Sequence, residues 1–551
     1  PTSRSGATRE AGPADLVFRH AAVYTVDAAR SWASAVAIRN GRITYVGGDS
    51  IPPALIGPAT EVVDLKGRMI LPAFQDGHVH PIDSGVQLGE CTVDDLKTGT
   101  EIADTIRAYA HAHPELKWVR GNGWQLPVFR NGNPSKAALD SVVPDRPALF
   151  YAADGHSAWV NSKALELAGI TKGTADPANG RIERAPGGEP SGTLRESAID
   201  LVAKILPERT PTELSAGLQR AQTMANKFGI TTVLSAATDE AALRAYSAAD
   251  RHGSLTFRVI AALHLGDPLP DSMLPKLRDL RTRYASPRVR PTVVKLFADG
   301  VIEARTAALL APYGDRKGDP GKPIYDPAAL KDLAAELDQD GFQIHVHAIG
   351  DRAIRMTLDA YAYARARNGT HDARHTITHL ELIDPDDIPR FRALGVVANF
   401  QAFWANGDEY LTKMTEPTLG AARSRWLYPI ESVYRTGAVV SGGSDWSVSS
   451  LNPLDAIEVG ITHRPPNQPN QAAWHLAERV DLPTMIAMYT INAAYQNHQD
   501  RETGSVEVGK LADLIVLDRN LFEVPTGEIH SVRVLRTLLE GKTVYQADRP
   551  D

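Results

Sequence analysis

Cysteine, long apolar runs and excess positive charge are all scarce in this 551-residue chain. The only cysteine is Cys91, which excludes an internal disulfide and leaves the redox compartment undetermined. No apolar run is long enough to span a membrane. Lysine and arginine number 59 against 66 aspartate and glutamate, so the chain lacks the basic footprint of a nucleic-acid binder. We therefore expect neither a membrane nor a nucleic acid as partner.

Length and a hydrophobic content of 43% are sufficient for a large core and for a main domain with accessory parts. Residues 1–13 are small and polar, and we expect them to be disordered. The start at Pro1 without a methionine fits removal of a signal peptide or recombinant trimming. The compartment is left open, with the cytoplasm as the default expectation and export as the alternative.

The most informative motif is His78-Val79-His80, which follows the apolar run Met69-Ile70-Leu71 and precedes Pro81. Side chains alternate along an extended strand, so both imidazoles lie on one face and can chelate one metal ion. The motif predicts a buried strand with histidines at its carboxyl end, where barrel enzymes keep their catalytic groups. The same spacing at His111-Ala112-His113 follows a helix-like stretch, so there we expect solvent-facing histidines at a helix end.

Metal-binding residue types recur where later apolar runs end. These runs lie in residues 291–300, 341–351, 374–381 and 438–445, and they carry Lys295, His345 and His347, His379, and Asp445. A lysine inside an apolar strand is costly unless it is neutralised, paired or modified. For Lys295, an ion pair with Asp299 or Glu303 is the ordinary alternative. Carbamylation by carbon dioxide also fits, because it turns the amine into a carboxylate-like bridge between two cations.

This ordered set of residues at strand ends resembles the amidohydrolase superfamily, the metal-dependent hydrolases on a (β/α)₈ barrel. Four segments resemble its YtcJ-like branch, which includes N-substituted formamide deformylases: residues 154–162, 295–300, 347–353 and 504–513. The resemblance runs from about residue 14 to about residue 545. One departure is Pro72-Ala73, where the family usually has Pro-Gly before the first strand's Phe; it affects backbone freedom and leaves the ligands in place.

The resemblance implies an α/β fold, a (β/α)₈ TIM barrel over residues 67–497. Short β-rich pieces in residues 14–66 and 498–551 have matching strand character, so we expect them to pair into one small composite β-sandwich. More than two hundred residues separate His80 from Lys295, where only the first half of a barrel is needed. We therefore expect an insertion at about residues 98–211, placed to cover the active site.

Carried over residue by residue, the resemblance implies two divalent metal ions, expected to be zinc. His78, His80 and Asp445 would hold one ion and His347 with His379 the other, with carbamylated Lys295 as a bridge. A site with a single metal remains an alternative. His345 and His375 share strand faces with His347 and His379, but the resemblance assigns the ligands to the latter pair. We therefore expect His345 and His375 to be structural neighbours.

The implied reaction is hydrolysis of a C–N bond in an amide, an N-substituted formamide or a cyclic amide by a metal-bound hydroxide. Asp445 would be the general acid/base that takes a proton and returns it to the leaving nitrogen. Heterocycle deamination is one alternative, although it usually uses one metal and no bridging lysine; a non-catalytic scaffold is another. We expect a small-molecule amide as substrate and a homodimer. The expected substrate contacts are His156, Trp124, Arg305 and Trp446, and further aromatic residues that could line a pocket are Trp159, Phe403 and Trp404.

Overall fold

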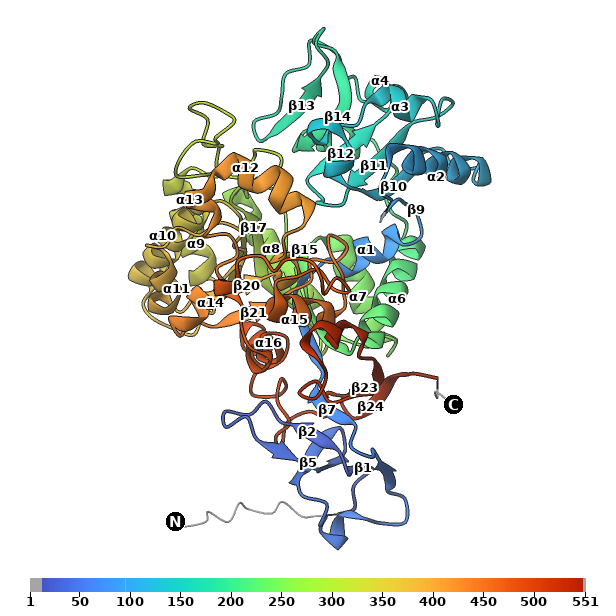
Figure 1. The fold of residues 1–551 in the computed structure, drawn as a ribbon, viewed down its shortest axis with the longest axis vertical. Coiled ribbons are helices and arrows are strands. Elements are labelled where there is room, and N and C mark those ends of the chain that lie inside the picture. Colours follow the sequence, from blue (N-terminus) through green and yellow to red (C-terminus); the bar gives the residue numbers. More distant parts are fainter. Residues whose placement is uncertain (1–11, 95, 549–551) are drawn as a thin grey trace.

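The computed structural model describes residues 12–94 and 96–548 (Figure 1). Residues 1–11, most of the segment expected to be disordered, lie outside the described residues. The centre of the molecule is a parallel sheet of eight strands in the order β21-β20-β19-β18-β17-β16-β15-β8. These strands are β8 (Phe74–Val79), β15 (Ile230–Thr238), β16 (Arg258–Leu263), β17 (Val289–Phe297), β18 (Gln343–Ala348), β19 (Thr376–His379), β20 (Val397–Phe400) and β21 (Val440–Gly442).

Backbone hydrogen bonds join the two outer strands of this sheet beyond their carboxyl ends. The N–H of Asp445 donates to the carbonyl of His78 at 2.8 Å, and the N–H of His80 donates to the carbonyl of Trp446 at 3.1 Å. Helices surround the sheet (Figure 1), and the fold is a (β/α)₈ barrel as expected. The helices are α1 (Pro81–Gln87), α6 (Pro211–Lys227), α7 (Glu240–Arg251), α8 (Leu274–Tyr284), α9 (Pro327–Gln339), α10 (Asp351–Asn368), α11 (Ile388–Leu394), α12 (Glu416–Leu419), α13 (Ala421–Ser424), α14 (Ile430–Arg435), α15 (Pro453–Thr462), α16 (Leu482–Met488) and α17 (Ile491–Gln496).

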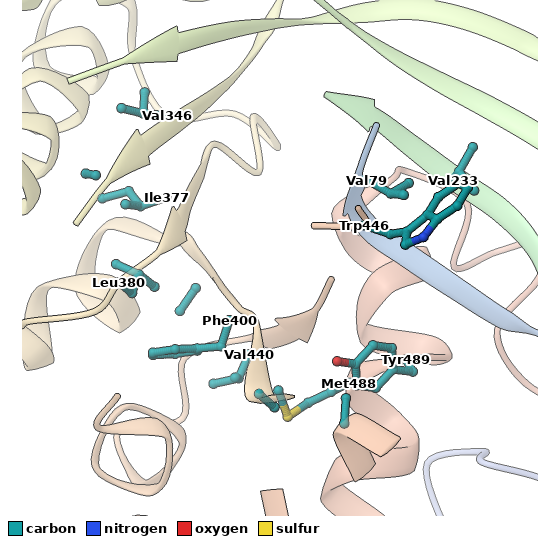
Figure 2. Close-up of a cluster of buried hydrophobic side chains, with 14 of the residues drawn as sticks. Val79, Val233, Val346, Ile377, Leu380, Phe400, Val440, Trp446, Met488 and Tyr489 are labelled. Atoms are coloured by element: carbon teal, nitrogen blue, oxygen red, sulfur yellow. The ribbon is translucent and has the colours of Figure 1, made fainter. Parts of the chain in front are cut away.

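Alternation along the strands separates apolar residues from histidines. Val79 lies between His78 and His80, and Val346 lies between His345 and His347. Both valines are buried in the main apolar core, which also includes residues of the neighbouring strands (Figure 2). Because successive side chains point to opposite faces, the histidines on either side of each valine face the barrel interior.

Two sheets at the opposite end of the barrel from the insertion contain both ends of the chain (Figure 1). One has the order β5-β4-β1-β6, and the other, β24-β23-β22-β7-β2-β3, combines strands from the two ends of the chain. An apolar core containing Phe18, Val36, Ile70 and Leu514 joins them. The strands are β1 (Leu16–Arg19), β2 (Ala22–Tyr24), β3 (Trp32–Ala33), β4 (Ala35–Arg39), β5 (Arg42–Gly47), β6 (Glu61–Asp64), β7 (Met69–Pro72), β22 (Leu514–Leu517), β23 (Val534–Leu539) and β24 (Lys542–Gln546).

The start of the barrel differs from the expected boundary at residue 67. The run Met69–Pro72 is β7, which pairs with β22 and β2 of the terminal sheet, so the first barrel strand begins at Phe74. The chain changes sheets within one residue. The N–H of Ala73 donates to Asp513 at 2.9 Å, whereas the N–H of Phe74 donates to Gly229, before β15, at 2.9 Å.

The insertion forms a sheet of its own in the order β13-β14-β12-β11-β10-β9, above the barrel in Figure 1. It begins at Cys91, earlier than the expected residue 98. Helix α2 ends at Ala112 with an exposed His111 in its last turn, as expected for the second His-x-His copy. Its elements are β9 (Cys91–Thr92), α2 (Gly99–Ala112), β10 (Val119–Trp124), α3 (Lys136–Asp140), β11 (Ala148–Ala152), β12 (Ser157–Val160), α4 (Ser162–Leu167), β13 (Gly180–Arg184), β14 (Pro190–Glu196) and α5 (Asp200–Ala203).

Helices α1 and α6 flank the insertion and pack closely at two glycines. A Cβ atom on Gly85 would lie 2.0 Å from the carbonyl oxygen of Gly217, so only glycine allows this approach. Within the described residues, no helix combines the length and the apolar character needed to cross a membrane.

Candidate metal centre

Ligand-type side chains from three strand ends converge inside the barrel. The Nε2 atoms of His78 and His80, at the end of β8, lie 3.3 and 3.1 Å from Oδ1 of Asp445, which follows β21. Nδ1 of His379, the last residue of β19, lies 4.0 Å from Oδ2 of Asp445. Ligand atoms of His78, His379 and Asp445 all lie within 4.8 Å of one another, and the three residues are buried. Such a group can hold a metal ion.

Lys295 reaches the same group from β17. Its Nζ lies 3.4 Å from Nε2 of His78 and 4.4 Å from the ring centre of Phe297. Among the described residues, no carboxylate lies within 4.0 Å of this amine, so the alternative ion pair with Asp299 or Glu303 is not formed. Burial lowers the pKa of Lys295 to about 7, although nearby Asp445 opposes this effect.

His347 lies next to His379, with ring centres 4.5 Å apart. Its Nε2 lies 3.2 Å from the carbonyl oxygen of Gly300 and 3.8 Å from Oδ1 of Asp299. The Asp299 carboxylate accepts the N–H groups of Ile349 and Gly350 at 3.0 and 2.9 Å. Asp299 therefore holds the turn that follows His347, a role that its position after β17 did not reveal.

The remaining nitrogens of the histidines have neighbours that fix the rings. Nδ1 of His78 lies 2.7 Å from Nε2 of buried His345, and Nδ1 of His379 lies 2.8 Å from Oε1 of Gln401. His375 lies at the start of the same strand region, where its Nδ1 accepts the N–H of Ile344 and its Nε2 lies 3.0 Å from Asp338. His345 thus contacts a candidate ligand, whereas His375 contacts Ile344 of β18 and Asp338 of α9. Gln401 carried no recognisable signal in the sequence.

The electrostatics of the group suit a divalent cation. Burial lowers the pKa values of His78, His347 and His379 well below the ordinary value, so their rings are neutral and keep a lone pair. Burial would raise the pKa of Asp445, but a hydrogen bond from His80 and nearby charges lower it to about 2. Neutral imidazoles with a carboxylate are the donor set that zinc prefers. The residues therefore fit a metal ion.

The insertion places a charged pair beside this group. Nδ1 of His156 lies 2.8 Å from Oε2 of Glu196, and its ring centre is 5.1 Å from that of His347. Burial disfavours the charged ring, but the Glu196 carboxylate outweighs it and raises the pKa of His156 to about 9. The other oxygen of Glu196 accepts the hydroxyl of Thr306 at 2.6 Å, which ties the insertion to the barrel. Of the expected substrate contacts, His156 lies next to the candidate ligands.

The other three expected contacts have different surroundings. Trp124 is 0% exposed, and its indole N–H donates to the carbonyl of Phe150 at 2.9 Å, so it belongs to the core of the insertion. The Arg305 guanidinium donates to Asp315 at 2.8 Å and is therefore already paired. Trp446 is 7% exposed and lies beside Val79 and Val233 in the apolar layer (Figure 2).

Trp404 packs directly against a candidate ligand. Its ring stacks on that of His379 with centres 5.5 Å apart and planes at 6°, and the residue is partly exposed. Trp159 is 1% exposed, and its indole N–H donates to the carbonyl of Ser135. Of these two pocket candidates, only Trp404 contacts a candidate ligand.

Comparison with known proteins identifies the same family that the sequence motifs resemble. A family model described as "Amidohydrolase family" matches residues 61–545. Protein LONG AFTER FAR-RED 3 of Arabidopsis thaliana is 31% identical over 540 residues, which cover 97% of this chain and 92% of that protein. N-substituted formamide deformylase of Arthrobacter pascens is 29% identical, with 97% of this chain and 98% of that protein covered. The crystal structure of an uncharacterized metal-dependent hydrolase from Pyrococcus horikoshii OT3 has a TM-score of 0.73 at 23% identity, covering 93% and 99% of the two chains, and this likeness shows the fold.

Proposed function

This chain belongs to the amidohydrolase family and to its YtcJ-like branch, and from this premise we propose that it hydrolyses the C–N bond of a small-molecule amide, N-substituted formamide or cyclic amide. The observation that carries the proposal is the convergence of His78, His80 and His379 on Asp445 inside the barrel. Formamide cleavage is named for the Arthrobacter relative, and full-length coverage of both chains supports carrying that reaction class over.

We propose that His78, His80 and Asp445 hold one zinc ion and that His347 and His379 hold a second. A bound zinc ion would lower the pKa of a coordinated water to about 7 and polarise the substrate carbonyl. Lys295 would bridge the ions as a carbamate. Its buried amine lies 3.4 Å from Nε2 of His78, and no carboxylate in the described part of the chain lies within 4.0 Å of it, which supports this role. The neutral amine adds to the carbon of carbon dioxide, forming an N–C bond and releasing one proton.

Asp445 has the protonation state that a general base needs. Its pKa of about 2 leaves a carboxylate at neutral pH, and the contacts with His78 and His80 fix its orientation. The carboxylate takes a proton from the attacking water and delivers it to the leaving nitrogen. An amine is a poor leaving group, so this second transfer is required for C–N cleavage. His156 lies next to His347, where its charged ring can donate a hydrogen bond to the substrate.

The test combines metal content with amine release. Protein purified with zinc and bicarbonate is analysed by elemental mass spectrometry and assayed against N-substituted formamides and aryl amides. We expect up to two zinc ions per chain, with turnover. His80→Ala should lose bound metal, whereas His111→Ala, which changes the exposed second copy of the motif, should retain it. Full turnover by rigorously metal-free protein, or by Asp445→Asn, would overturn the proposal.

A further inference from the structure

We propose that the active site contains a subsite for a positively charged group of the substrate, an organic ammonium or guanidinium ion. This acidic subsite consists of the carboxyl groups of Asp154, Glu303, Glu381 and Asp408. The inference rests on the proposed function and extends it, because it names the class of N-substituent that the enzyme prefers. The four residues come from the insertion and from the segments that follow β17, β19 and β20.

The acidic subsite adjoins the candidate metal ligands. Glu381 follows His379 by two residues at the end of β19. Asp154 precedes His156 by two residues, and its Oδ1 accepts the N–H of His156 at 2.9 Å. Glu303 belongs to the segment of Gly300, whose carbonyl oxygen lies 3.2 Å from His347. Three of the four carboxyl groups are therefore carried by the segments that position the ligands and His156.

The four carboxyl groups lie close enough to influence one another. Glu303 and Glu381 are hydrogen-bonded through their side chains. Burial raises the pKa of Glu303, and nearby Asp154 raises it further. Burial, with a contribution from Glu303, raises the pKa of Asp408 to about 6. Asp154 and Asp408 therefore both lie near the Glu303–Glu381 pair.

Two buried oxygens of the acidic subsite have no hydrogen-bond donor. Within the described residues, no lysine, arginine or histidine side chain forms an ion pair within 4.0 Å of these four carboxylates. Glu381 is 3% exposed, and its Oε1 has no hydrogen-bond partner. Oδ2 of Asp154 is likewise buried and unpartnered. A proton shared by Glu303 and Glu381 would satisfy that pair, but Oδ2 of Asp154 would still lack a donor, at a cost of about 1–3 kcal/mol.

Aromatic residues beside the carboxyl groups match the same ligand chemistry. Burial raises the pKa of Tyr410, and Asp154, Glu303 and Asp408 are close enough to raise it further. Trp404 is partly exposed and stacks on His379. Aromatic faces attract ammonium and guanidinium ions. The nearby cations His156, Arg195 and Arg305 already pair with Glu196, Glu183 and Asp315. None of them is therefore left unpaired for a carboxylate group of the substrate.

The test uses two substrates of equal length that differ in charge, N-(5-aminopentyl)formamide and N-hexylformamide. We expect kcat/KM to favour the amine about tenfold or more, because charge-assisted hydrogen bonds are roughly twice as strong as neutral ones. Glu381→Gln and Asp154→Asn should each reduce this preference about tenfold. Glu166→Gln removes one charge from exposed α4, far from any proposed role, and should leave the preference unchanged.

A binding measurement separates the subsite from the reaction. Calorimetric titration with pentylammonium chloride, with pentanol as the neutral control, should show binding that Glu381→Gln weakens. Hydrolysis of both formamides at equal efficiency, without ammonium binding, would overturn the subsite and leave the hydrolase intact. Ammonium binding without hydrolysis of either formamide would support the subsite and overturn formamide cleavage as the proposed reaction.

Discussion

Replacing Glu196 with glutamine should switch the charge of His156 at neutral pH. Glu196→Gln keeps the shape of the side chain and removes the carboxylate 2.8 Å from Nδ1 of His156. The pKa of His156 is raised from 6.5 to about 9, a difference that corresponds to about 3.4 kcal/mol at 1.36 kcal/mol for each pH unit. Without the carboxylate, burial is the dominant effect and the pKa should fall below 6.5. The ring would then be neutral at pH 7.

The pair of His156 and Glu196 stabilises the fold only within a certain range of pH. The raised pKa of His156 gives stability that is complete below pH 6.5 and lost as the pH rises through about 9. The lowered pKa of Glu196 gives stability that is present above pH 4.5 and lost as the pH falls. The free energy of unfolding of Glu196→Gln should therefore approach that of the wild type at both extremes of pH. Between them the variant should be less stable by up to about 3.4 kcal/mol.

The assay is NMR of ¹⁵N-labelled histidine rings in metal-free protein, with the His156 signal assigned from a His156→Gln sample. Metal-free protein is used because a cation next to His347 would itself change the titration. Glu166→Gln serves as the surface control and should leave the His156 titration unchanged. A His156 ring that titrates at the same pH in the wild type and in Glu196→Gln would refute the reasoning.

Three further outcomes are expected. Asp445→Asn at saturating zinc should reduce kcat about 10²–10⁴-fold, the usual contribution of general acid–base catalysis; unchanged kcat would remove Asp445 from proton transfer. Lys295→Met should abolish any dependence of metal content on bicarbonate, measured by elemental analysis, and a dependence that persists would exclude the carbamate. Gly85→Ala should lower the free energy of unfolding by about 1–3 kcal/mol in urea titrations, because its Cβ would press on the backbone of Gly217. Gly48→Ala, which meets nothing within 4 Å, is the control, and an equal loss there would contradict the packing argument.

The barrel and the family were predictable from the sequence, and both are confirmed. Strand alternation is a local property, so the shared face of His78 and His80 could be read from three residues. The sheet change at Ala73 could not, because the apolar run from Met69 to Phe74 has no local signal for two different sheets. That change is set by backbone hydrogen bonds to Asp513 and Gly229, far along the chain.

The other features that could not be predicted from the sequence depend on tertiary contacts. Trp124 lies in a Gly-rich stretch typical of a loop, but the structure places it in strand β10, and its indole is buried in an apolar core with residues from other segments. The acidic subsite is assembled from four distant segments, and none of its carboxylates is unusual within its own stretch of sequence. A carboxyl oxygen without a hydrogen-bond partner can be recognised only when the neighbours of that atom in the structure are known. The candidate ligands remain predictions that the metal analysis tests.

The hydrogen bonds that close the barrel can form only after most of the chain has been synthesised. Asp76 of β8 accepts the N–H of Ser444, which lies 368 residues later in the chain. At about 5–20 residues per second, a ribosome needs about 20–70 s to make the intervening polypeptide. During that interval the insertion sheet, whose strands all lie between Cys91 and Glu196, can form from neighbouring segments. His78 and His80 are synthesised long before Asp445. A nascent chain arrested before β21 would therefore contain both histidines but have neither a closed barrel nor a complete set of metal donors.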